Sequence, residues 1–167
     1  MNDTPDLSRL EGRLAALEAE KAILNTLYQY GHSIDYGLRS NWLDCFTEDG
    51  VFELKYAQPP SARVAERGYG ERTAEGYRFA GRAGLTSFIE HHTYAPHAWH
   101  KHFLVEPRIT VAPDGRSATA ASYFARLDDR NGERIILAFG RYLDELTLQD
   151  DGKWRFVQRT AEIESAL

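Results

Sequence analysis

The chain has 167 residues, of which 43% are hydrophobic, so it can build one domain with a substantial core. A formal net charge of -5 and the lack of a basic run argue against nucleic acid as a partner, because that binding depends on neutralising phosphates. The sequence shows neither a leader-like segment nor the run of about 18 apolar residues that would cross a bilayer. We therefore expect one cytoplasmic domain over residues 1–167, without a nucleic-acid or membrane partner.

The first predicted element is a long helix from Ser8 to Asp35, with Gly37 as its stop signal. A stripe of helical period runs along it and consists of Leu7, Leu10, Leu14, Leu17, Lys21, Leu24, Tyr28, Gly31 and Asp35. Its leucines predict an N-terminal arm, residues 1–14, and subunit contact in a homodimer or homotrimer. Lys21 interrupts the near-heptad spacing, so a coiled coil is the weaker interpretation.

The remaining elements predict an α+β fold, in which helices come first and an antiparallel meander follows. Ser40 is a predicted N-cap, and the residues from Lys55 to Gly81 form a long loop and a candidate lid. The pattern predicts helices over Asn41–Phe46 and Arg82–His92, and strands over Val51–Leu54, His97–Val105, Ser117–Leu127, Arg134–Thr147 and Trp154–Ile163.

Asp35 and the histidine-bearing strand suggest an acid/base pair. Period two puts His100 and His102 on one strand face and Trp99 on the other. A carboxylate at the edge of an apolar interior needs a donor, and an Asp can hold an imidazole in one tautomer. The alternatives are that Asp35 caps a helix end and that His102 is a core histidine bonded to a backbone carbonyl.

Five of the six histidines fall within twelve residues, which raises the question of a metal site. A cupin-like site would need a later-strand histidine, and none follows His102. We therefore expect neither a metal nor a cofactor, with a three-ligand site left as an alternative. We expect His91, His92 and His97 to be exposed, and Cys45, the one cysteine, to be a buried filler.

The chain resembles the SnoaL-like branch of the nuclear transport factor 2-like superfamily over roughly residues 15 to 163. The motifs that carry the resemblance are Tyr28-Gln29-Tyr30, Asp35-Tyr36-Gly37, Phe46-Thr47-Glu48-Asp49-Gly50-Val51-Phe52, His100-Lys101-His102, Ala118-Thr119-Ala120-Ala121-Ser122-Tyr123-Phe124, Gly140-Arg141-Tyr142 and Gly152-Lys153-Trp154-Arg155-Phe156. The resemblance implies a cone-shaped α+β barrel, a curved antiparallel sheet wrapped on helices around one deep apolar pocket.

The resemblance also implies a site. Scytalone dehydratase, a bile-acid dehydratase and a dehydrochlorinase are relatives in which an Asp at the end of the first helix pairs with a strand His, and Asp35 and His102 match those positions. Tyr30 falls where the bile-acid enzyme places a catalytic tyrosine. Arg126 stands where that enzyme has a further carboxylate, and Tyr123 stands where the fungal dehydratase has a second His, so the substrate does not carry over.

These observations predict a cofactor-independent dehydratase, isomerase or cyclase that acts on a small hydrophobic cyclic carbonyl compound. Asp35, His102 and Tyr30 are the expected catalytic residues. The expected substrate-binding residues are Tyr28, Trp99, His100, Tyr123 and Phe124. The superfamily also contains noncatalytic members, so the alternative is a binding or assembly subunit like the β subunit of a ring-hydroxylating dioxygenase.

Overall fold

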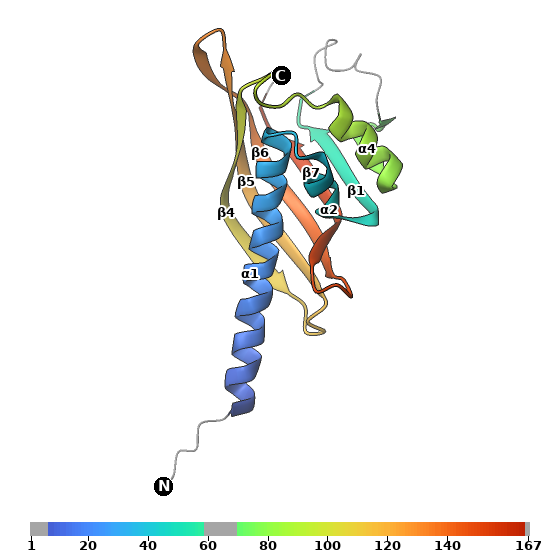
Figure 1. The fold of residues 1–167 in the computed structure, drawn as a ribbon, viewed down its shortest axis with the longest axis vertical. Helices are drawn as coiled ribbons and strands as arrows, with labels where there is room; N and C mark the ends of the chain where they lie inside the picture. The colour runs from blue at the N-terminus through green and yellow to red at the C-terminus, as the bar shows by residue number, and fades with distance from the viewer. Residues whose placement is uncertain (1–6, 59–69, 166–167) are drawn as a thin grey trace.

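A computed structural model describes residues 7–58 and 70–165 of the chain. Within them, helices occupy α1 (Leu7–Asp35), α2 (Arg39–Asp44) and α4 (Gly81–His91), and strands occupy β1 (Phe46–Tyr56), β2 (Glu71–Arg72), β3 (Gly76–Ala80), β4 (His100–Val111), β5 (Ser117–Arg130), β6 (Glu133–Leu148) and β7 (Trp154–Ile163). Helices lie on one face of a curved, unclosed sheet (Figure 1). This architecture confirms the predicted α+β class.

The seven strands form one sheet in the order β2-β3-β1-β7-β6-β5-β4. Strands β4 to β7 are an antiparallel meander, whereas β1 pairs with β7 in parallel, so the sheet is mixed and not purely antiparallel. Register shifts interrupt the pairing of β1, β4, β5 and β6. Such bulges bend strands, which accounts for the curvature around the helices.

Helix α1 ends where the sequence predicts, because Gly37 adopts a left-handed φ of 67° and Leu38 donates a hydrogen bond back to the carbonyl of Ser33. The apolar face that packs inward lies one residue away from the predicted stripe and consists of Ile23, Leu27, Tyr30 and Ile34, whereas Asp35 of the stripe is itself buried. The stripe residues of the N-terminal half stay exposed because this half of α1 projects beyond the sheet, as Figure 1 shows.

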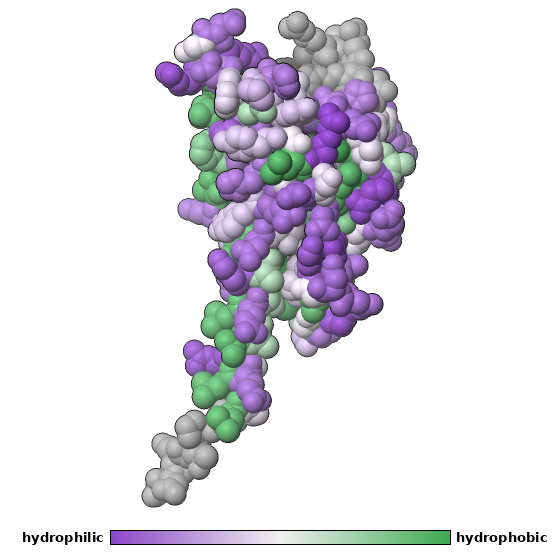
Figure 2. All heavy atoms as spheres, in the orientation of Figure 1, coloured by the Kyte–Doolittle hydropathy of each residue, from purple (hydrophilic) through white to green (hydrophobic). Residues whose placement is uncertain are grey.

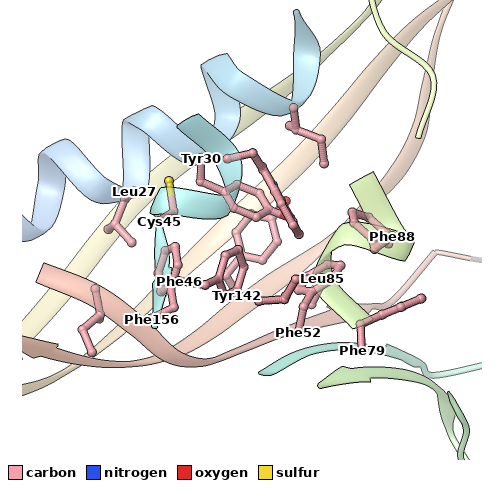
Figure 3. Packing of buried hydrophobic residues seen from close by; sticks show 14 of the residues in the cluster. Leu27, Tyr30, Cys45, Phe46, Phe52, Phe79, Leu85, Phe88, Tyr142 and Phe156 are labelled. Carbon is pink, nitrogen blue, oxygen red and sulfur yellow. The ribbon is translucent and has the colours of Figure 1, made fainter. Parts of the chain in front are cut away.

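Aromatic side chains fill the space between α1, the sheet and α4 (Figure 3). Trp42 stacks on Phe88 with ring centroids 5.3 Å apart, and Tyr30 packs edge-on against Phe156 and Tyr142. Cys45 is buried in this core, as predicted. A rigid ring cluster of this kind fixes α1 near Tyr30 relative to the sheet, close to the end of the helix that carries the candidate site.

Several predicted boundaries are wrong for identifiable reasons. Strand β4 continues past Pro107 to Val111, because β4 is the edge of the sheet and a bulge at Glu106, φ 50°, accommodates the missing N–H. Ser40 lies inside α2 and is not its N-cap. The predicted loop after Lys55 contains β2 and β3, and its residues 59–69 lie outside the described chain. Among the described helices, none combines the length and the apolar composition needed to cross a bilayer.

Candidate functional site

Asp35 and His102 form a hydrogen-bonded pair between the end of α1 and strand β4. Oδ1 of Asp35 lies 2.6 Å from Nδ1 of His102, and Oδ2 accepts a second hydrogen bond, 3.0 Å long, from the backbone N–H of His102. Asp35 is only 3% exposed. The predicted contact is therefore confirmed, and both oxygens of the buried carboxylate have a donor.

The charges of the pair follow from this geometry. Burial alone would raise the pKa of Asp35, but the hydrogen bonds from the ring and the backbone of His102 outweigh it and lower that pKa, so the carboxylate is ionised. Burial lowers the pKa of His102 more than Asp35 raises it, which keeps the imidazole neutral. Because an ionised carboxylate only accepts hydrogen bonds, the ring proton lies on Nδ1 and Nε2 retains its lone pair.

His100 is a second buried imidazole beside the pair. Its Nε2 lies 3.7 Å from Oδ1 of Asp35 and 3.3 Å from Nε2 of His92, and its Nδ1 has no hydrogen-bond partner among the described residues. Burial, with help from Arg126 and His102, lowers the pKa of His100 to about 4. His92, expected to be exposed, is half-buried against this ring, because the chain after α4 folds over β4.

An ion pair on β5 faces the two histidines. Arg126 is the cross-strand partner of His102, and Asp128 is the partner of His100. Nε and one terminal nitrogen of Arg126 donate to the two oxygens of Asp128, over 2.7 and 3.1 Å. Asp128 follows Arg126 by two residues on the same strand, a spacing that predicts both side chains on the same face of the sheet. Sequence reasoning did not assign a role to Asp128.

A cleft of about 450 Å³ opens next to this cluster. Its walls include His92, Arg126 and Asp128, and the other lining residues are His91, Thr93, Arg130 and Leu137. The volume falls in the range of small-molecule sites. The cleft is lined mainly by polar and charged side chains, unlike the apolar pocket that the resemblance implies.

The structure separates the expected substrate-binding residues into two groups. Phe124 and His100 face the interior, and Phe124 stacks on Tyr142. Tyr28, Trp99 and Tyr123 instead point outward, with 46%, 56% and 60% of their surfaces exposed. These three placements correct our expectation that the side chains line the pocket.

Strand register explains the clearest of these corrections. Tyr123 pairs with Val105 on one side and Arg141 on the other, and a residue and its cross-strand partners share a sheet face. That face is the outer one, since Val105 is exposed as well. Of Tyr30 and Tyr123, only Tyr30 is buried in the interior.

The cluster also offers metal ligands. Asp35, His100 and His102 each present a ligand atom, and these atoms lie within 4.8 Å of one another. Carboxylate and imidazole are suitable ligands for Zn²⁺ and related ions. In this arrangement, however, Oδ1 of Asp35 and Nδ1 of His102 already satisfy each other at 2.6 Å. The donor set therefore fits a hydrogen-bonded pair without requiring an ion.

The fold matches solved structures over most of its length. An NTF2-like protein with a cystatin-like fold from Novosphingobium aromaticivorans is 22% identical, with 96% of this chain and 91% of that chain covered at a TM-score of 0.75. A β subunit of a putative aromatic-ring-hydroxylating dioxygenase from the same organism is 20% identical, with 91% and 93% covered at 0.67. ActVI-ORFA from Streptomyces coelicolor is 21% identical, with 86% and 96% covered at 0.64.

Among curated proteins, no sequence matches this chain. The model of the SnoaL-like domain matches residues 15–160, a span that runs from α1 into β7 and contains both members of the Asp35–His102 pair. The chain therefore belongs to the SnoaL-like family, within the NTF2-like fold.

Proposed function

We propose that this protein is a cofactor-independent lyase or isomerase that removes a proton adjacent to the carbonyl of a hydrophobic cyclic compound. The observation that carries this proposal is the buried Asp35 carboxylate, 2.6 Å from Nδ1 of His102. That contact leaves Nε2 of a neutral imidazole as a base, and Arg126, the cross-strand partner of His102, lines a neighbouring cleft.

In the proposed reaction, Nε2 of His102 takes the proton, the electron pair of the C–H bond forms a C=C bond, and the π electron pair of the C=O bond moves to the carbonyl oxygen. Asp35 keeps the ring in one tautomer and stabilises the imidazolium that forms. The resulting enolate either expels a hydroxyl group on the next carbon, which leaves as water with the proton from His102, or is reprotonated at another carbon. The first course is a dehydration and the second an isomerisation.

Two side chains are suited to the negative charge that develops on oxygen. Arg126 lies opposite His102 on β5 and brings a guanidinium to the same inner face. Tyr30 is buried, and burial raises its pKa well above the ordinary value, so its hydroxyl stays protonated and can donate a hydrogen bond. We assign the polarising role to Tyr30, and we assign ligand contact to His100 and Phe124.

Proton exchange tests this function before the natural substrate is known. The protein is incubated in D₂O with 1-tetralone, a bicyclic ketone with hydrogens next to its carbonyl, and mass spectrometry follows deuterium uptake. We expect uptake above the buffer rate, and we expect Asp35→Asn and His102→Ala to lower the enzymatic rate by about 10² to 10⁴-fold.

Thermal unfolding of both variants provides the control, since a folded but inactive protein is the expected outcome. The exposed His32 on the same helix provides a matched variant, His32→Ala, that should exchange at the wild-type rate. Exchange at the buffer rate by the wild-type protein, or full exchange by both site variants, contradicts the proposal.

The second candidate function is a noncatalytic assembly subunit. It is favoured by the likeness to a putative dioxygenase β subunit and by the apolar residues exposed on the outer sheet face, Phe103, Val105, Tyr123 and Phe139. Such a protein would keep the Asp35–His102 contact for stability alone. Asp35→Asn would then lower the melting temperature in the absence of any measurable proton exchange by the wild-type protein.

A further inference from the structure

A second polar cluster lies deeper in the interior, on neighbouring strands. Arg159 of β7 and Asp144 of β6 are cross-strand partners, 0% and 3% exposed, with Nε of the guanidinium 3.5 Å from Oδ1 of the carboxylate. Among the described residues, none of the three guanidinium nitrogens and neither carboxylate oxygen has a hydrogen-bond partner. The pair is thus held close but is not joined by the two parallel hydrogen bonds that Arg and a carboxylate usually form.

Aromatic rings fix the guanidinium in place. Its carbon lies 3.8 Å from the ring centre of Tyr142, 4.0 Å from that of Tyr30 and 4.6 Å from that of Phe156. These cation–π contacts stabilise the buried positive charge of Arg159 through the faces of the guanidinium. Its N–H groups, at the edge of the guanidinium plane, remain available as hydrogen-bond donors. The indole Nε1 of Trp42, whose ring is 5.7 Å from that of Tyr30, is another buried donor without a described partner.

This arrangement does not favour the stability of the folded protein. Buried polar atoms without partners cost free energy, and apolar residues of similar volume often replace a buried ion pair without loss of stability. Among the described residues, the interior therefore holds donors on Arg159 and Trp42 and acceptors on Asp144 that its own side chains do not satisfy. A bound group that both donates and accepts hydrogen bonds would satisfy the guanidinium and the carboxylate together.

The cluster shares its interior with the Asp35–His102 pair. Tyr30, which covers Arg159, precedes Asp35 by five residues on α1, a rise of about 7.5 Å. Tyr142 lies between the two sets: burial raises its pKa to about 12, and the charges of Arg159, Asp144 and Asp35 all act on it. Tyr30 and Tyr142 thus connect the two polar clusters across the interior.

We propose that Arg159 and Asp144 bind a hydroxyl group at the end of the substrate opposite to the carbon that His102 deprotonates. A hydroxyl oxygen accepts from the guanidinium while its proton is donated to the carboxylate, so one uncharged group satisfies both partners. Asp144 already balances the charge of Arg159, which makes an anionic ligand unsuitable. The inference rests on the proposed function and narrows the substrate class to hydroxylated cyclic carbonyl compounds.

Three ketones that differ at one position test this inference. The dissociation constants of 6-hydroxy-1-tetralone, 6-methoxy-1-tetralone and 1-tetralone are measured by calorimetry at pH 7.5. We expect the hydroxyl compound to bind at least about tenfold more tightly than 1-tetralone, as hydrogen bonds to charged groups permit. The methoxy compound accepts but cannot donate, so it should lose most of this gain.

The double substitution Asp144→Leu with Arg159→Met removes both charged side chains of the pair and so leaves no unpaired charge. It should fold, bind 1-tetralone as the wild-type protein does, and no longer prefer the hydroxyl compound. Asp144→Asn is the isosteric second variant, and it should reduce the difference between the hydroxyl and methoxy compounds even if the double variant does not fold.

The binding test of this inference and the exchange test of the proposed function can fail independently of each other. Asp35→Asn should stop deuterium exchange but keep the preference for the hydroxyl compound, because the preference is a property of binding. If the wild-type protein binds the three ketones equally, or binds none of them, the inference is wrong. It is also wrong if the double variant keeps the preference, a result that would make the pair a purely structural feature.

Discussion

Asp35 accepts two hydrogen bonds from a single residue, His102: one from the imidazole Nδ1 and one from the backbone N–H. The backbone contact fixes the carboxylate against β4, and the ring contact then sets the orientation of the imidazole. Because one residue supplies both donors, moving the carboxylate by even a fraction of an ångström would disturb the proton-accepting nitrogen as well. The end of α1 and strand β4 thus behave as one unit at the site.

The two tyrosines of the Tyr28-Gln29-Tyr30 segment should differ sharply in importance. Tyr30→Phe removes a buried hydroxyl that we assign to the carbonyl oxygen, so it should lower the rate of proton exchange by about 10² to 10³-fold, the range found for a lost donor to a developing oxyanion. Tyr28→Phe is the matched control, since Tyr28 is exposed on the same helix and should exchange normally. Equal rates in the two variants would remove Tyr30 from the mechanism.

Stability should depend on pH through His100. Its folded pKa of about 4 lies below the ordinary histidine value of about 6.5, so between these limits the unfolded chain binds a proton that the folded chain does not. Stability therefore falls as pH falls through this window. Relative to His100→Gln, the wild-type protein should lose up to about 3 kcal/mol between pH 7 and pH 4.

Chemical denaturation at a series of pH values measures this difference. The buried Asp144 acts in the opposite direction, because burial raises its pKa to about 6 and the folded chain then binds the extra proton. Asp144 is present in both proteins, so its contribution cancels in the comparison. Parallel stability curves for the two proteins would show that His100 does not titrate differently on folding.

The exposed leucines of α1 should form a subunit contact. Leu7, Leu10, Leu14 and Leu17 lie on the projecting half of the helix, where Figure 2 shows hydrophobic residues on the surface. We expect a homodimer or homotrimer in light scattering at micromolar concentration, and a smaller species for Leu14→Glu with Leu17→Glu. Arg13→Glu changes the charge of the same segment and should leave the assembly intact. A wild-type monomer would contradict this prediction.

Protein purified without added metal should contain less than one transition-metal ion per chain, and chelation should leave proton exchange unchanged. The reason is that Oδ1 of Asp35 and Nδ1 of His102 already satisfy each other, so a metal between these two atoms would have to replace a formed hydrogen bond. Elemental analysis together with exchange after dialysis against EDTA tests this. One metal ion bound per wild-type chain and lost from the His100→Ala variant would contradict this prediction and indicate a metal-dependent mechanism.

The sequence predicted those elements in which one periodicity dominates. The limits of β7 agree with the predicted strand, and Asp35 and His102 meet as expected. The buried face of α1 could not be predicted in the same way. The regular leucine stripe at the N-terminus of α1 belongs to an exposed arm, and the core contacts come from Ile23, Leu27, Tyr30 and Ile34. A pattern of apolar spacing does not say whether the partner is the chain itself or another subunit.

Parts of the site depend on long-range register and could not be predicted. Tyr123 points outward because of its partners in β4 and β6, and the half-buried position of His92 depends on how the chain leaves α4. The Arg159–Asp144 pair arises from the register of β6 on β7, which places two charged residues of separate strands side by side in an aromatic interior. A register shift between Glu145 and Leu146 interrupts the pairing of β6 with β7, and the alternation of local sequence does not predict where such a shift falls.

The protonation state of His102 tests the central claim most directly. Nitrogen-15 NMR of the histidine side chains at pH 7 distinguishes a protonated Nδ1 from a protonated Nε2 and from an imidazolium. We predict that His102 is neutral with its proton on Nδ1, and that in Asp35→Asn the amide N–H₂ shifts the proton to Nε2 and so removes the base. A wild-type His102 that carries its proton on Nε2, or that is an imidazolium at pH 7, would contradict the account.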